Sequence, residues 1–119
     1  MADFLSAAWF DEINDALSRA PAPPPDVLPW RLVVEFTKAP STVPSALTLT
    51  LDDSGARLEP GDHVNAETTI RLTFDDAHAL SAGRLTSADA LRDGRLTVRG
   101  DLGPAVAVMA WAREAYHSR

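Results

Sequence analysis

With 119 residues and an apolar content of 45%, the chain has the length and composition of one globular domain. Its net charge of −6 disfavours nucleic-acid binding and electrostatic docking on anionic lipid, because both depend on clustered Lys and Arg. The chain has no cysteine, which excludes disulfides and thiolate sites, and no apolar run near the roughly 20 residues that span a bilayer. Without a signal-peptide pattern, we expect a single cytoplasmic domain over residues 1–119, with no membrane segment and no nucleic-acid partner.

The first predicted element is an amphipathic helix over residues 6–19. Trp9, Ile13 and Leu17 recur at four-residue spacing, and Phe10 lies beside them on the same face. Ser6 is the expected N-cap, because serine oxygens accept hydrogen bonds from free backbone N–H groups in a first helical turn.

A proline-rich linker follows over residues 20–29. Its four clustered prolines are incompatible with a continued helix and favour an extended, semi-rigid chain. Such a linker would let the first helix pack on its own domain or on that of a neighbouring copy.

Five strands are predicted next, each with apolar residues at alternate positions on one face only. The expected inward residues are Trp30, Leu32, Val34 and Phe36; Leu47, Leu49 and Leu51; Ala56 and Leu58; Thr68, Ile70, Leu72 and Phe74; Leu96 and Val98. Strands of this kind are typical of a sheet that is covered on one side and wet on the other, so we predict an α+β fold.

Two short helices are expected between the fourth and fifth strands. Asp75 or Asp76 is the predicted cap of the first, and Gly83 its left-handed end. The second is expected to begin at Thr86, with Asp89 three residues later as a capping-box variant. It should end at Gly94.

The last predicted helix begins at Asp101 and is apolar all round. From Pro104 to Ala112 it reads PAVAVMAWA, whereas a helix lying on a sheet needs only an apolar stripe. Its second face must therefore be buried. Either the first helix covers it with Trp9 and Phe10, or an apolar cavity lies between the helices and the sheet, and both alternatives stay open at this point.

Catalytic and metal-binding patterns are lacking. The three histidines, His63, His78 and His117, do not pair at helical spacing, so no metal site is expected. The serines lack a nucleophile-elbow context, and no glycine-rich phosphate loop is present. We therefore predict no catalysis and no cofactor.

Three arginines are expected on the wet face of the sheet: Arg71, Arg95 and Arg99. The favoured interpretation is cross-strand pairing with Glu35 or Glu67. The alternative is a surface for a protein partner or an anionic membrane.

The segment AETTIRLTFDDAHALSAGRLTSADALRDGRLTVRGDLGPAVAVMAW resembles the second half of sterol carrier protein domains, the non-specific lipid-transfer proteins. The opening FLSAAWFDEINDAL is similar to the first helix of actinobacterial members. The positions that carry the resemblance are Leu80 and Gly83, then Leu91, Gly94, Leu96, Val98 and Gly100.

This resemblance implies a five-stranded, mostly antiparallel sheet covered on one face by an N-terminal helix, two short helices and a C-terminal helix. It also implies an apolar tunnel for sterols, fatty acids or similar lipids. The expected ligand-binding residues are Phe36, Leu80, Leu91, Val98, Leu102, Val106 and Met109. Because Lys38 is the only lysine, a neutral lipid is favoured over acyl-CoA.

Two other functions remain open. A dimerisation or interaction module would use Trp9, Phe10 and Trp111 at its interface, with the first helix exchanged between copies. An accessory domain would serve an enzyme encoded elsewhere and would bind no lipid.

Overall fold

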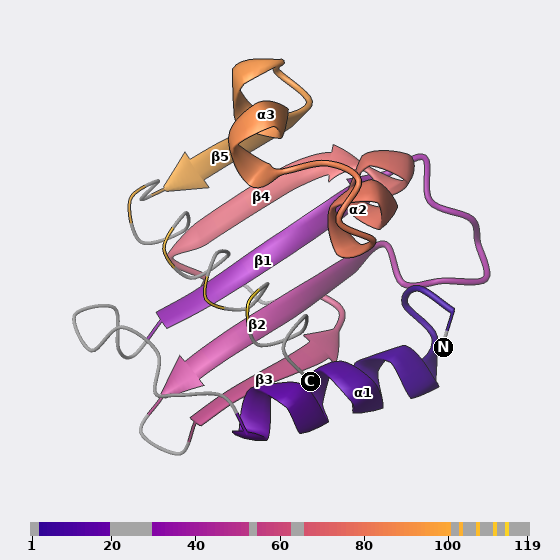
Figure 1. The fold of residues 1–119 in the computed structure, drawn as a ribbon, viewed down its shortest axis with the longest axis vertical. Helices are drawn as coiled ribbons and strands as arrows, with labels where there is room; N and C mark the ends of the chain where they lie inside the picture. The colour runs from indigo at the N-terminus through magenta and orange to yellow at the C-terminus, as the bar shows by residue number, and fades with distance from the viewer. Residues whose placement is uncertain are drawn as a thin grey trace.

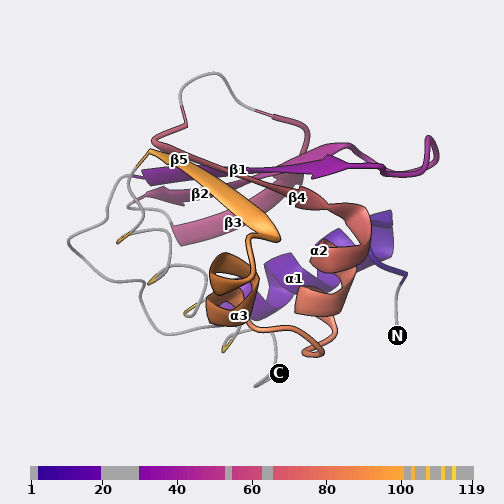
Figure 2. The same cartoon turned by 90° about the horizontal axis from the view of Figure 1, so that it is seen from above.

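A five-stranded sheet with all the described α-helical segments on one side forms the domain (Figures 1 and 2). This computed structural model describes residues 3–19, 30–52, 55–62 and 66–100, together with residues 103, 107, 111 and 114. The predicted linker, residues 20–29, lies outside the described residues.

The strands follow the order β3-β2-β1-β4-β5 across the sheet. Their bounds are Trp30–Thr37 for β1, Ala46–Asp52 for β2, Gly55–Pro60 for β3, Thr68–Thr73 for β4 and Leu96–Gly100 for β5. β1 and β4 run parallel, whereas the other three neighbouring pairs are antiparallel. The predicted α+β class and the mostly antiparallel sheet are confirmed.

The inner face of the sheet, the one covered by helices, carries the core. Strand register places Leu49, Leu32 and Thr68 side by side across β2, β1 and β4. Ile70 then pairs with Val98 of the edge strand β5. Leu51 and Ile70 are among the most deeply buried side chains, so the predicted alternation correctly identified this face.

Helix α1 spans Ala7–Arg19 and begins as predicted, because the Ser6 hydroxyl accepts a hydrogen bond from the Trp9 N–H at 3.2 Å. The prediction for the next helix was wrong by two or three residues. Helix α2 spans Phe74–Ser81, and its cap is Thr73, whose hydroxyl accepts from the Asp76 N–H. Phe74 therefore opens α2 and does not end β4.

The other helix ends agree with the sequence. Gly83 has a φ of 78° after α2, and Gly94 a φ of 71° after helix α3, Ser87–Arg92. The Thr86 hydroxyl accepts from the Asp89 N–H at 3.1 Å, which is the predicted cap of α3. These local signals were readable because a cap depends on only three or four consecutive residues.

The outer face of the sheet is less exposed than predicted. Val33 is only 3% exposed, and the outward Thr48 and Thr50 are also buried. The Thr48 hydroxyl donates to the Gly61 carbonyl at 2.8 Å, so the chain leaving β3 lies over this face. Figure 2 shows the described ends of the connection from β3 to β4 on the side of the sheet away from the helices. The reason is topological, since the chain must pass β2 and β1 to reach β4.

A polar contact fixes α1 along the β3 edge. The Asn14 side chain donates to the Leu58 carbonyl at 2.9 Å and accepts from the Leu58 N–H at 2.6 Å. Figure 1 shows α1 running beside β3. Both backbone groups of Leu58 are thus satisfied by one amide, which protects this position of an edge strand from pairing with another chain.

The predicted last helix is described only at four positions. Gly103, Ala107, Trp111 and Glu114 are helical. Trp111 is half-buried and packs against the core. The rest of the apolar run from Pro104 to Ala112 lies outside the described residues.

Candidate functional site

Four of the predicted ligand-binding residues meet on one side of the sheet. Phe36 is buried in the core on the inner face of β1. Leu80 from α2, Leu91 from α3 and Val98 from β5 are half-buried and pack against the same core. The fold thus places these four residues in one layer between sheet and helices, as expected.

The remaining three predicted ligand-binding residues are Leu102, Val106 and Met109. All three lie outside the described residues, so their place relative to this layer stays a prediction.

Trp9 and Phe10, predicted at an interface, are buried in the core of their own chain. Their rings are in edge-to-face contact at 5.1 Å. Phe4 joins them, with its ring 5.1 Å from Trp9 and 6.2 Å from Phe36. Helix α1 therefore closes one side of the inner layer with aromatic side chains, and Phe4 is a contributor that the sequence pattern did not single out.

Val34 has an unexpected exposure. It lies on the inner face near the middle of β1, which is itself the central strand. Its cross-strand neighbours Leu47 and Ile70 are buried, yet Val34 is only half-buried. Because backbone and neighbouring strands enclose its other sides, the exposed part of this side chain faces the helices. Alternation places Val34 inward, but its exposure depends on the packing above it.

The indole N–H of Trp30 is a second unexpected feature of the inner face. The residue as a whole has an exposed fraction of only 5%. Its indole Nε1–H is buried and finds no hydrogen-bond acceptor in the part of the chain that the structure describes. Buried polar groups are nearly always paired, so this donor is an exception.

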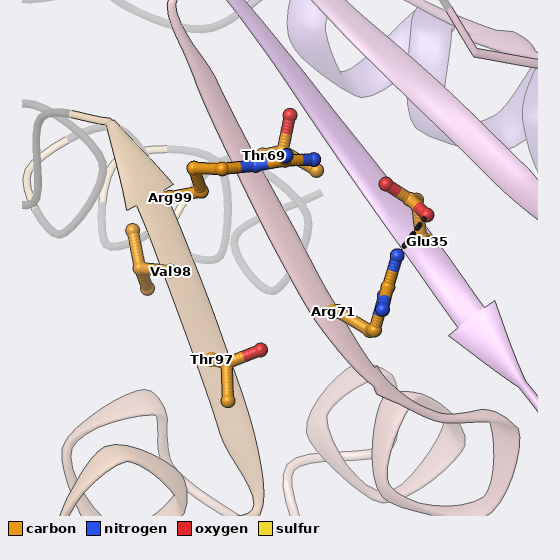
Figure 3. Close-up of a pocket in the computed structure, with 6 residues that line it drawn as sticks. All are labelled: Glu35, Thr69, Arg71, Thr97, Val98 and Arg99. Atoms are coloured by element: carbon orange, nitrogen blue, oxygen red, sulfur yellow. Dashed lines mark hydrogen bonds and ion pairs between the residues drawn. The ribbon is translucent and has the colours of Figure 1, made fainter.

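A hollow of about 380 Å³ lies on the outer face (Figure 3). The predicted cross-strand pair is present there, since Arg71 contacts Glu35 at 3.1 Å. Arg95 instead lies 3.7 Å from Asp76. The residues that line the hollow are Glu35, Thr69, Arg71, Thr97, Val98 and Arg99. Most of this lining consists of hydroxyl and charged groups, whereas an apolar molecule binds by burying apolar surface against apolar surface. The hollow therefore does not suit an apolar ligand.

Metal ligands do not cluster in the described residues, where no group of three His, Asp or Glu side chains could hold an ion. Within the same residues, no helix has the length and apolar character needed to cross a bilayer. The described site therefore consists of apolar packing surface with one unpaired indole donor.

Solved structures share this fold. The apo form of sterol carrier protein 2 from Yarrowia lipolytica has a TM-score of 0.63 at 19% identity, covering 100% of this chain and 98% of that one. A crystal structure of sterol carrier protein 2 also has a TM-score of 0.63, at 22% identity, covering 97% and 95%. No curated protein matches the sequence.

A segment of a larger enzyme is similar as well. The inverting sec-alkylsulfatase Pisa1 from Pseudomonas sp. has a TM-score of 0.56 at 16% identity, over 86% of this chain. The chain spans only 12% and 14% of the length of the two alkylsulfatase structures that it matches. At these identities, the similarity to the alkylsulfatase structures shows a shared fold only.

The family follows from the sequence itself. Residues 13–113 match the family model described as the SCP-2 sterol transfer family, and this range covers both the helical layer and the sheet. The chain therefore belongs to the SCP-2 sterol transfer family.

Proposed function

We propose that this protein binds and carries an apolar lipid between the inner face of its sheet and the helices. Membership in a sterol transfer family supports lipid binding or transfer in general. The observation that carries the proposal for this chain is the partial exposure of Val34 at the centre of the helix-covered face. A fully packed core leaves no such exposure at its middle.

The energetics favour an apolar ligand at this place. The described residues that share the core layer with Val34 are aliphatic or aromatic, including Phe36, Leu80, Leu91 and Val98. Each Å² of apolar surface that a lipid removes from water here contributes about 25 cal/mol. Leu102, Val106 and Met109 complete the proposed lining. We propose a non-catalytic carrier, because this lining offers no nucleophile or acid–base pair.

Saturable lipid uptake by delipidated protein is the direct test. The fluorescent fatty acid cis-parinaric acid and a fluorescent sterol serve as probes in parallel titrations. We expect at least one to bind saturably and to be displaced by unlabelled lipid. Titrations that rise linearly with either probe would contradict the proposal.

Val34→Phe and Val33→Phe form a matched pair that locates the ligand. Both variants add the same volume to adjacent residues of β1, but Val34 faces the helices and Val33 the outer surface. If lipid occupies the inner layer, Val34→Phe fills its space and lowers uptake at little cost in stability. Val33→Phe overpacks a buried site, costs about 1–3 kcal/mol, and leaves uptake by the folded protein unchanged. Chemical denaturation measures the stability of each, and equal uptake by both variants would contradict an inner site.

The dimer alternative receives no support from the described contacts. Of its three predicted interface residues, Trp9 and Phe10 are buried within their own chain, and Trp111 is half-buried against the same core. A role beside a separate enzyme remains a prediction, which copurification from the host would test.

A further inference from the structure

The hollow on the outer face lies on the opposite side of the sheet from the proposed lipid site, and lipid carriage leaves its polar lining without a role. Its volume of about 380 Å³ is in the range of small-molecule pockets. Arg71, Thr97 and Arg99 line it and are exposed, so a ligand reaches all three from water. The hollow is therefore an accessible polar site.

Arg99 brings a charge to this hollow that no described carboxylate compensates. Other arginines of the fold have partners, since Arg57 contacts Glu59 at 2.8 Å and Arg95 lies 3.7 Å from Asp76. Within the described residues, Arg99 forms no ion pair, although acidic residues outnumber basic ones by 17 to 11 in the chain. Its guanidinium donors are thus available to an external anion.

Strand register brings further donors to the same place. Arg99 of β5 is directly opposite Thr69 of β4. Thr97 is likewise opposite Arg71. Figure 3 shows the Arg99 side chain extending across β4 toward Thr69, whereas Arg71 is turned toward Glu35. Arg71 donates to Glu35 from Nη2 at 3.1 Å, but a guanidinium has five N–H groups, so donors remain for a second acceptor.

The charges of the lining select the ligand. Arg71 and Arg99 contribute two positive charges and Glu35 one negative charge, so a ligand with a single negative charge compensates the excess. A phosphate monoester carries roughly 1.5–2 negative charges at neutral pH and would be repelled by Glu35. A carboxylate carries one, and its two oxygens match the planar fork of an arginine. The net charge of −6 opposes larger polyanions such as nucleic acid or an anionic membrane.

We infer that the outer hollow binds a small carboxylate, which Arg99 holds through a bidentate contact beside the Thr69 hydroxyl. A hydroxyl group on the same ligand finds its partner in Thr97 or Arg71, so small hydroxy acids belong to the expected class. This second site goes beyond lipid carriage, and neither function depends on the other.

Titrations with small anions, followed by NMR, test the site directly. Lactate is the carboxylate probe, lactamide its uncharged analogue and methyl phosphate the more highly charged one, all at the same ionic strength. We expect lactate to shift the backbone amide signals of Thr69, Thr97 and Arg99 saturably. Lactamide should leave these signals in place, because it lacks the charge that Arg99 recognises. Methyl phosphate should bind more weakly than lactate.

Arg99→Gln and Arg84→Gln form a matched pair. Each removes one exposed positive charge without an ion pair in the described part of the chain, but Arg84 does not line the hollow. Arg99→Gln should weaken lactate binding about tenfold, the lower end of what a hydrogen bond to a charged group is worth. Arg84→Gln should change it by less than about twofold, since its charge acts only through the general field of the protein. Arg99→Lys keeps the charge without the fork, so its affinity should fall between the two.

Glu35→Gln tests the charge count. It removes the negative charge from the lining, so two arginines are left uncompensated and methyl phosphate should then bind more tightly than lactate. An unchanged preference for lactate would contradict the selection by charge.

The remaining outcomes are equally decisive. The inference is overturned if lactate gives no saturable shift, if lactate and lactamide act alike, or if Arg99→Gln and Arg84→Gln weaken lactate equally. Tighter binding of methyl phosphate than of lactate to the unaltered protein would also overturn it. So would a glutamate-rich peptide that shifts these signals when lactate does not, because the hollow would then serve a protein partner. Lipid uptake is measured with separate probes, so none of these results bears on the proposed carrier function.

Discussion

Single residues of this protein are constrained by contacts that a sequence pattern reports only in part. The glycine at the end of β5 is an example, because its position in the family pattern says nothing about what it touches. A Cβ added to Gly100 would lie 2.3 Å from the Glu67 carbonyl oxygen, and Gly100 also has a φ of 102°. Two separate physical reasons, the backbone conformation and the close approach of the Glu67 carbonyl just before β4, thus require glycine there.

Gly100→Ala should therefore be strongly destabilising. We expect a loss of about 2–4 kcal/mol in the free energy of unfolding, from left-handed strain together with the clash against backbone. Urea denaturation followed by circular dichroism measures this loss.

Gly61→Ala is the matched control for this variant. Gly61 has a nearly equal φ of 99°, but a Cβ there would meet nothing within 4 Å. It should show the conformational part of the cost alone. Equal losses in the two variants would contradict a steric role for the Glu67 carbonyl.

Whole elements were easier to predict than their placement. The spacing of Trp9, Ile13 and Leu17 predicts α1 correctly, because an amphipathic stripe is a local property of the chain. It does not predict that α1 lies along β3, nor that Asn14 completes the edge at Leu58. That pairing joins residues 44 positions apart, and no local signal marks it.

Asn14→Ala tests how firmly α1 is held. Removing both hydrogen bonds to part-buried Leu58 groups should cost about 1–3 kcal/mol of stability. Asp15→Ala, which removes an exposed pair with Arg19 on the same helix, should change stability by less than about 0.5 kcal/mol. Thermal and urea unfolding of both variants measure the difference, and similar losses would show that Asn14 is not a specific tether.

The molecule as a whole is organised by one parallel contact in an otherwise antiparallel sheet. The parallel pairing of β4 with β1 leaves β3 on the far side of β2, and the chain that leaves β3 lies over the outer face at Gly61. Thr48, which alternation alone assigned to water, is covered where its hydroxyl donates to the Gly61 carbonyl, and Val33 on the same face is also buried. The helices are then left on the inner face, where the proposed lipid would lie (Figure 2).

Ligand binding to this inner layer should stabilise the entire fold. A lipid that binds the folded chain and not the unfolded one adds about 2.7 kcal/mol at a free concentration of 100 times its Kd. We expect the Tm of delipidated protein to rise with lipid concentration. Val34→Phe should reduce this rise, whereas an equal rise in both proteins would place the ligand elsewhere.

The sequence by itself determined the class of fold, the inner residues of the strands apart from Phe74, and the caps at Ser6, Thr86, Gly83 and Gly94. These features depend on side-chain periodicity and on a few consecutive residues, which a sequence displays directly. It also indicated the family, through an ordered set of glycines and aliphatic residues.

Only the tertiary structure decided how these residues are packed and which of them stay accessible. The strand order, the cover on the outer face, the exposure of Val34 and the orphaned N–H of Trp30 all depend on contacts between distant segments. The apolar pattern places Trp30, Val34 and Leu32 alike on one face. Packing against the other elements leaves the Trp30 N–H without a partner among the described residues and Val34 partly accessible. Leu32, between them, is an ordinary core residue.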